Sequence, residues 1–126
     1  RLFTLMAIDH AAGEAARLYT NRPDDYPVGG RKPLGRMTGW GEVVLGAHRP
    51  WIGRTAEDIQ WAFFDHDLIA SLGCASCLNL PVIDGDRVIG TVNLLHEAGF
   101  YDEASIAAAA PFAPLLVAPY RAFATG

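Results

Sequence analysis

Two apolar stretches joined by an Asp-Gly pair constrain the fold of this chain more than any other feature. Residues 76–83 alternate apolar side chains with others, and residues 87–95 form a second apolar stretch. Asp84-Gly85 between them is a strong short-range hairpin signal, because both central residues of a type I′ turn need a positive φ. The sequence therefore predicts a long antiparallel β-hairpin.

Two residues inside this hairpin carry positional information. Pro81 lacks a backbone N–H, so we expect it at an edge-like or bulged position of its strand. Gly90 lies in the middle of the second strand, where a missing side chain indicates that another backbone or side chain comes close.

The rest of the chain predicts short strands and helices. Apolar runs, capping residues and Pro/Gly clusters indicate the boundaries. In chain order the elements are a strand over 2–8, its hairpin partner over 14–21 with one polar face, a loop over 22–35, a helix over 39–45, an extended piece over 48–52, helices over 55–63 and 65–72, the central hairpin, and a buried, proline-interrupted helix that begins at Glu103.

This order predicts an α+β fold with a central, largely antiparallel sheet and helices on both faces. A length of 126 residues suits one domain, so residues 1–126 are expected to form a single unit. Apolar residues make up 51% of the chain and charged residues 19%, which excludes a disordered chain.

Charge and cysteine content restrict the partners and the compartment. A formal charge of −4 argues against nucleic-acid binding, which needs a basic surface. Two cysteines make no disulfide framework and indicate the reducing cytoplasm. The apolar stretch from Ala104 to Tyr120 contains three prolines and is short for a bilayer span, so no membrane contact is expected.

The hairpin region resembles GAF domains. Members of that family have a similar S-x-x-x-x-P strand, tight turn and V-I-G-x-x-N-L strand, which match Ser76 to Pro81 and Val88 to Leu94. The order of elements matches over nearly all of the chain. Such domains usually begin with a helix that pairs with the last helix, and the resemblance implies that this helix would lie before Arg1.

The resemblance implies a sensory or regulatory domain rather than an enzyme. GAF domains commonly hold a small cytosolic molecule between the sheet and the short helices over it, and often form homodimers through their terminal helices. Their ligands are diverse, so the cofactor or ligand stays unknown. The absence of a lysine after Asn93 argues against a cyclic nucleotide. The absence of a histidine beside Cys74 or Cys77 argues against a bilin.

Five residues are the candidate ligand contacts in such a pocket. Aromatic side chains with a polar group and polar residues on central strands suit a small-molecule site. The candidates are Tyr19, Trp40, His66, Ser76 and Asn79. By contrast, we expect Asn93 to tie its strand to the following loop, and Trp61, on a helix face with Phe64, to belong to the core.

Two alternatives to a sensor stay open. Cys74 and Cys77 form a C-x-x-C pair, which a redox enzyme similar to the free methionine sulfoxide reductases could use. The pair follows a helix rather than beginning one, so buried structural thiols are the simpler interpretation. No metal site and no hydrolytic triad are indicated. The other alternative is a structural dimerisation module without a ligand.

A glycine pair followed by two cations is the last candidate. Gly29-Gly30 and then Arg31-Lys32 could cradle an anion through backbone N–H groups. A solvated loop is the competing interpretation.

Overall fold

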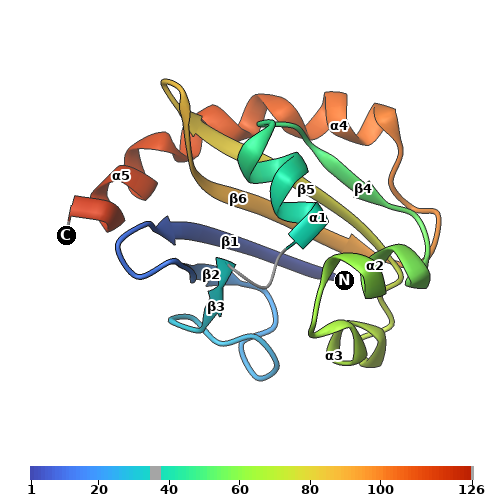
Figure 1. Cartoon of the computed structure of the whole chain (residues 1–126). Coiled ribbons are helices and arrows are strands. Elements are labelled where there is room, and N and C mark those ends of the chain that lie inside the picture. Colours follow the sequence, from blue (N-terminus) through green and yellow to red (C-terminus); the bar gives the residue numbers. More distant parts are fainter. Residues whose placement is uncertain (35–37, 126) are drawn as a thin grey trace.

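The computed structural model describes residues 1–34 and 38–125 and contains one six-stranded sheet (Figure 1). All neighbouring strands are antiparallel, in the order β3-β2-β1-β6-β5-β4. The strands are β1 (Leu2–Asp9), β2 (Glu14–Thr20), β3 (Arg31–Pro33), β4 (Trp51–Gly53), β5 (Ser76–Asp84) and β6 (Arg87–His96).

Helices lie on both faces of the sheet (Figure 1). One face carries the first helices, and the other carries the continuous C-terminal helical segment. The helices are α1 (Thr38–Gly41), the π-helical turn η2 (Glu42–Gly46), α2 (Ala56–Ala62), α3 (His66–Ser71), α4 (Glu103–Ala109), the 3-10 segment η3 (Ala110–Leu116) and α5 (Val117–Thr125). This arrangement confirms the expected α+β fold class.

The central hairpin forms as its sequence predicts. Asp84 pairs with Arg87, and Gly85 between them has a φ of 67°. Pro81 lies beyond the end of β4, which pairs only with residues 77–79 of β5 among the described residues. The proline therefore occupies a part of β5 whose β4 side is open, as expected for a residue without an N–H donor.

Gly90 is the point where the last helix approaches the sheet. A β-carbon there would collide with the Tyr120 ring and with the backbone oxygen of Met6. Tyr120 is buried, and its hydroxyl donates a 2.8 Å hydrogen bond to the carbonyl oxygen of Thr91. The glycine thus lets α5 dock directly on β6, which confirms the expected close approach.

A β-bulge changes the face to which the end of β2 points. Met6 pairs with Arg17 and Leu5 pairs with Tyr19, so Leu18 is the extra residue. Arg17 therefore shares a face with Met6, while Tyr19 points to the opposite face, where its ring contacts Phe3 at 5.7 Å. The expectation of one polar face carrying both Arg17 and Tyr19 was wrong for this reason.

Two other local predictions were wrong. Residues 31–33 of the expected loop form β3, which pairs with β2; residues 35–37 lie outside the described part of the chain. Trp61 does not belong to the core, because it is 57% exposed, and the nearby Phe64 is 50% exposed. The Trp61 ring instead stacks on Trp51 at the surface of α2.

The C-terminal segment is not a buried helix. Ala113 and Tyr120 pack on the sheet, but Phe112 is 63% and Leu115 71% exposed. The stretch Glu103–Phe123 is long and apolar enough to span a membrane by length and composition alone, and few of its residues are buried. That criterion is weak by itself, since core helices of soluble proteins also satisfy it. Here the stretch is divided by a 3-10 segment around Pro111 and Pro114.

Candidate functional site

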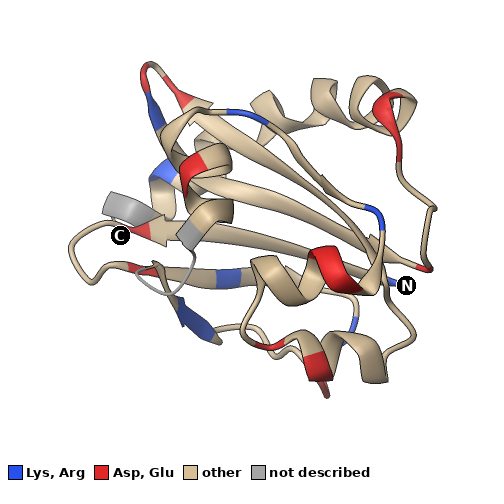
Figure 2. Ribbon diagram, turned by 45° about the vertical axis from the view of Figure 1, so that its right-hand side comes forward, with Lys and Arg blue, Asp and Glu red and all other residues tan. Residues whose placement is uncertain are grey.

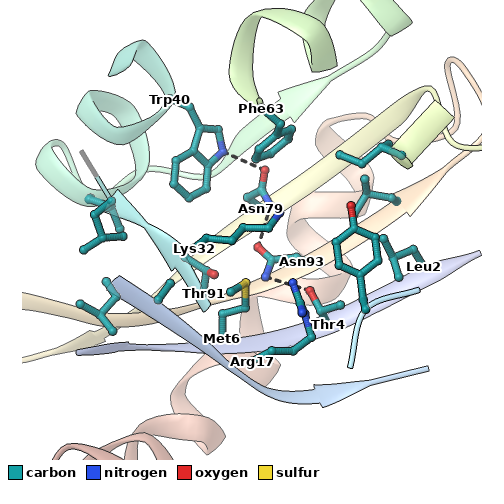
Figure 3. A pocket seen from close by; sticks show the side chains of 17 residues that line it. Leu2, Thr4, Met6, Arg17, Lys32, Trp40, Phe63, Asn79, Thr91 and Asn93 are labelled. Carbon is teal, nitrogen blue, oxygen red and sulfur yellow. Dashed lines mark hydrogen bonds between the residues drawn. The ribbon is translucent and has the colours of Figure 1, made fainter. Parts of the chain in front are cut away.

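A cavity lies between the sheet and a cover formed by α1, η2, α3 and Phe63, which directly follows α2; Figure 3 shows the side chains that line it. Its volume is about 50 Å³, and side chains from five of the six strands contribute to its walls together with Trp40, Leu45, Phe63 and Ile69. Because alternate residues of a strand point to one face, Leu2, Thr4, Met6 and Ile8 of β1 all line it. The register of the sheet therefore decides which residues reach the cavity.

Four of the lining residues form a continuous chain of buried hydrogen bonds, which we call the amide ladder. Trp40 Nε1 donates to Asn79 Oδ1 at 2.9 Å, Asn79 Nδ2 donates to Asn93 Oδ1 at 2.7 Å, and Asn93 Nδ2 donates to Thr4 Oγ1 at 3.2 Å. The ladder crosses from α1 over β5 and β6 to β1 (Figure 3). It places polar atoms in the middle of the sheet face that borders the cavity.

The amide ladder leaves hydrogen-bonding capacity unused. A primary amide has two N–H donors, and the ladder uses one from each asparagine. Buried donors usually find partners in the protein, in water or in a ligand. Since Asn79 and Asn93 both line the cavity, a molecule inside it could accept their remaining hydrogens.

A charged cluster also borders the cavity, through Lys32, Tyr26 and Arg17. Lys32 Nζ lies 2.6 Å from Asp65 Oδ2, and the Tyr26 hydroxyl donates to the same oxygen at 2.7 Å. Burial alone would raise the pKa of Asp65, but Lys32 and Tyr26 outweigh it and hold the pKa below its ordinary value. Burial lowers the pKa of Lys32, and Asp65 only partly offsets that.

Arg17 completes this cluster, and its guanidinium is almost fully buried. The residue is 4% exposed, lines the cavity, and lies over the Tyr26 ring at 4.6 Å. Its Nη1 donates to the carbonyl oxygen of Pro27 at 3.2 Å, whereas its buried Nε has no partner among the described residues. Burial lowers its pKa from the ordinary value, because it disfavours the charged form.

Of the five candidate contacts, the structure brings together Trp40 and Asn79. Both line the cavity, and they share a hydrogen bond. Asn93 joins them, so the expectation that it would tie its strand to the following loop was wrong. Asn93 stands directly opposite Asn79 in the β5–β6 register, which turns its side chain to the same face.

The other three candidates lie elsewhere. Tyr19 and Ser76 belong to the opposite face of the sheet: the bulge turns Tyr19 there, and Ser76 Oγ accepts the Tyr101 backbone N–H at 3.3 Å. His66 lines a separate surface notch between α2 and α3, with its Nδ1 3.3 Å from Asp67. None of the three lines the cavity.

Sequence reasoning missed Arg17 and Lys32 as cavity residues. Alternation with apolar neighbours in residues 14–20 indicated a solvated face for Arg17, and Lys32 lay in an expected loop. Asp65 is the N-cap residue of α3, but its carboxylate binds Lys32 and Tyr26 and makes no capping hydrogen bond. The pairing of β3 with β2 brings Lys32 to the cavity. No local sequence pattern predicts that pairing.

The Gly29-Gly30 segment does not form an open anion cradle. The N–H of Gly29 donates to the Arg17 carbonyl at 2.9 Å, and that of Gly30 donates to Pro27 at 3.2 Å. Arg31 lies 3.0 Å from Asp9. These donors are therefore used within the protein, and Gly30 instead makes room for the Arg17 guanidinium, which a β-carbon there would meet.

Both cysteines are free and buried. Burial raises the pKa of each thiol, most strongly for Cys77, whose Sγ donates to Asn79 Oδ1 at 3.1 Å. A raised thiol pKa disfavours the thiolate, which is the reactive form. In residues 1–34 and 38–125, no group of three or more His, Cys, Asp and Glu side chains could hold a metal ion.

No protein-family model matches the chain, and no curated protein sequence matches it. Solved structures do match over nearly its whole length. The GAF domain of a phosphoenolpyruvate-protein phosphotransferase from Coxiella burnetii aligns with a TM-score of 0.78 at 19% identity, covering 99% of this chain and 76% of that one.

Two further structures agree. A GAF domain/HD domain protein from Geobacter sulfurreducens gives a TM-score of 0.75 at 14% identity, covering 96% of this chain and 82% of that one. The phycocyanobilin-bound GAF domain of a cyanobacterial phytochrome gives 0.70 at 13% identity, covering 98% and 74%. At these identities the likeness concerns the fold: this chain has the fold of GAF domains.

Proposed function

We propose that this chain is a sensory or regulatory domain that binds a small cytoplasmic molecule in the cavity and carries out no catalysis. The observation that carries the proposal is the amide ladder. Four buried polar side chains converge beside a cavity in a sheet face that apolar residues could have filled. Polar groups at fixed positions in a mostly apolar cavity are typical of ligand sites, where they set orientation and specificity.

Some solved structures with this fold are domains of sensory proteins, which supports the proposal. One neighbour is a domain of a two-component sensor histidine kinase from Bacillus halodurans, and the phytochrome domain holds phycocyanobilin. We extend only the general role, recognition of a small molecule, to this chain. Its cavity of about 50 Å³ is much too small for a bilin.

A thermal-shift screen with a library of cytosolic metabolites tests this function. A compound at about 100 times its Kd stabilises the folded state by about 2.7 kcal/mol, which raises the melting temperature measurably. We expect at least one compound to stabilise the wild type and to lose this effect in Asn79→Leu. The matched control is Asn21→Ala, outside the cavity. A library without a stabiliser would contradict the proposal.

A second candidate role is self-association through the C-terminal helices. α4 and η3 form an apolar groove of about 490 Å³ with the sheet, in which Phe112 and Leu115 are exposed (Figure 2 shows almost no charge along this segment). Exposed apolar surfaces of this kind often mark interfaces. We propose a homodimer there, with no nucleic acid and no membrane as partner. Sedimentation of Leu115→Glu beside the wild type tests it: a wild type that stays monomeric would contradict this role.

A further inference from the structure

We infer that the cavity binds a short monocarboxylic acid, and that Arg17 holds its carboxylate. This inference rests on the proposed function and narrows it to one chemical class of ligand. It starts from a buried guanidinium that makes no direct ion pair with a carboxylate of the described residues, although Asp65 attracts it from farther away.

The charges around the cavity do not balance. Lys32 and Asp65 form an ion pair at 2.6 Å, and Asp65 also attracts Arg17 from farther away, so two cations share one carboxylate. No carboxylate among the described residues lies within ion-pair distance of Arg17, which is 4% exposed. A buried charge is costly unless it is paired. An anion inside the cavity would supply the missing charge.

The geometry of Arg17 points to the same conclusion. Its Nη1 is used by the Pro27 carbonyl and its flat face covers Tyr26, but its buried Nε has no acceptor among the described residues. Arg17 points from β2 into the cavity that the amide ladder borders (Figure 3). A guanidinium binds carboxylates through two parallel N–H donors. Protein atoms cover the Nε atom itself, so a carboxylate would bind at the part of the guanidinium that faces the cavity.

The remaining walls select among anions. Leu2, Met6, Ile8, Leu34, Leu45 and Leu95 line the cavity, and such hydrocarbon surface disfavours phosphate, which needs several donors and carries up to two charges. One surplus positive charge matches one carboxylate. A cavity of about 50 Å³ favours a short acid over a long one. Acetate and propionate are short acids of this kind.

The probe experiment uses the indole N–H of Trp40, which belongs to the amide ladder at the cavity wall. The ¹⁵N-labelled chain is titrated with sodium propionate at constant ionic strength, and the Trp40 signal is assigned with Trp40→Phe. Propionamide is the neutral isostere, and sodium phosphate and sodium hexanoate are the charge and length controls. We expect a saturable shift with propionate and none with propionamide or phosphate.

Three variants locate the carboxylate. Arg17→Gln should weaken propionate binding about ten- to hundredfold, the usual effect of losing a hydrogen bond to a charged group. Gly30→Ala keeps the arginine but moves its guanidinium, since the new β-carbon would meet Nη1, and should also weaken binding. Arg87→Gln removes an exposed arginine from the end of β6 and should change nothing.

The outcomes separate this inference from the proposed function. Equal binding of propionamide, tighter binding of phosphate, or unchanged binding in a folded Arg17→Gln variant each overturns the carboxylate. If only neutral metabolites stabilise the protein, the proposed sensory function stands, and the inference of a monocarboxylate ligand is overturned. If nothing binds in either experiment, both fall.

Discussion

Asn79 and Asn93 face each other directly in the β5–β6 register, and the side-chain nitrogen of Asn79 donates to the side-chain oxygen of Asn93 at 2.7 Å. Two buried amides at matched positions of neighbouring strands form the centre of the cavity wall. Each also binds a residue from another element, Trp40 on α1 and Thr4 on β1. The pair thus links α1, on one side of the cavity, to β1 of the sheet.

Asn79→Ala should lower the free energy of unfolding by about 2 kcal/mol, because it leaves Trp40 Nε1 and Asn93 Oδ1 buried without a partner. Urea unfolding of Asn79→Ala, Asn93→Ala and the double variant measures this. We expect a coupling energy of at least about 0.5 kcal/mol between the two positions. Strict additivity would show that the amides do not act as one unit.

The Asp65 carboxylate should make the free energy of unfolding depend on pH. Its pKa in the folded state lies below the ordinary value of 3.8, so it stabilises the fold above that pH. This contribution disappears as the pH falls below 3.8 through the folded-state pKa. The stability difference between wild type and Asp65→Asn should therefore shrink between pH 6 and pH 2.

Chemical unfolding at each pH measures this difference. Asp67→Asn is the matched control, because the neighbouring Asp67 side chain is fully exposed. A difference for Asp65→Asn that stays constant down to pH 2 would mean that the ion pair with Lys32 does not form.

Gly90→Ala should destabilise the protein by about 1–3 kcal/mol, as overpacking of a close contact does. The new methyl group would meet the Tyr120 ring and the backbone oxygen of Met6, and the backbone cannot move aside cheaply. Gly46→Ala is the matched control, because its β-carbon would have no neighbour closer than 3.8 Å. Thermal unfolding of both variants is the measurement; equal stabilities would contradict the docking of α5 on β6.

The thiols of Cys74 and Cys77 should react slowly with a disulfide reagent in the native protein and fast after unfolding. Both are buried, and burial raises the pKa of each, so little thiolate exists near neutral pH. Stopped-flow measurement of thiol release gives the two rates. Fast reaction in the folded state would contradict this prediction and favour the alternative that the chain is a redox enzyme. Turnover of free methionine sulfoxide is the direct assay for that alternative.

The sequence predicts some features of the fold and of the cavity but not others. The central hairpin follows from local chemistry, since Asp84-Gly85, Pro81 and Gly90 each have a conformational reason for their place. Trp40 and Asn79 were also found, because polar groups next to apolar strand residues are visible in sequence. The face of a side chain was less predictable: the bulge at Leu18 turned Tyr19 away and left Arg17 inside.

The charged cluster could not be predicted, for a physical reason. Lys32 reaches Asp65 across 33 residues, and this contact depends on β3 pairing with β2 and on the position of α3. Such long-range placement has no local signature. The exposure of Phe112 and Leu115 has the same origin, because an apolar helix reads alike whether it covers a core or faces outward.

A crystal structure of the chain grown with the best stabilising compound tests the ligand cavity most directly. We expect density for that compound between the amide ladder and Arg17, within hydrogen-bond distance of Asn79 or Asn93. A cavity closed by the protein's own side chains, or a compound bound only in the notch by His66 or in the groove by Leu115, would contradict a ligand site on this face of the sheet.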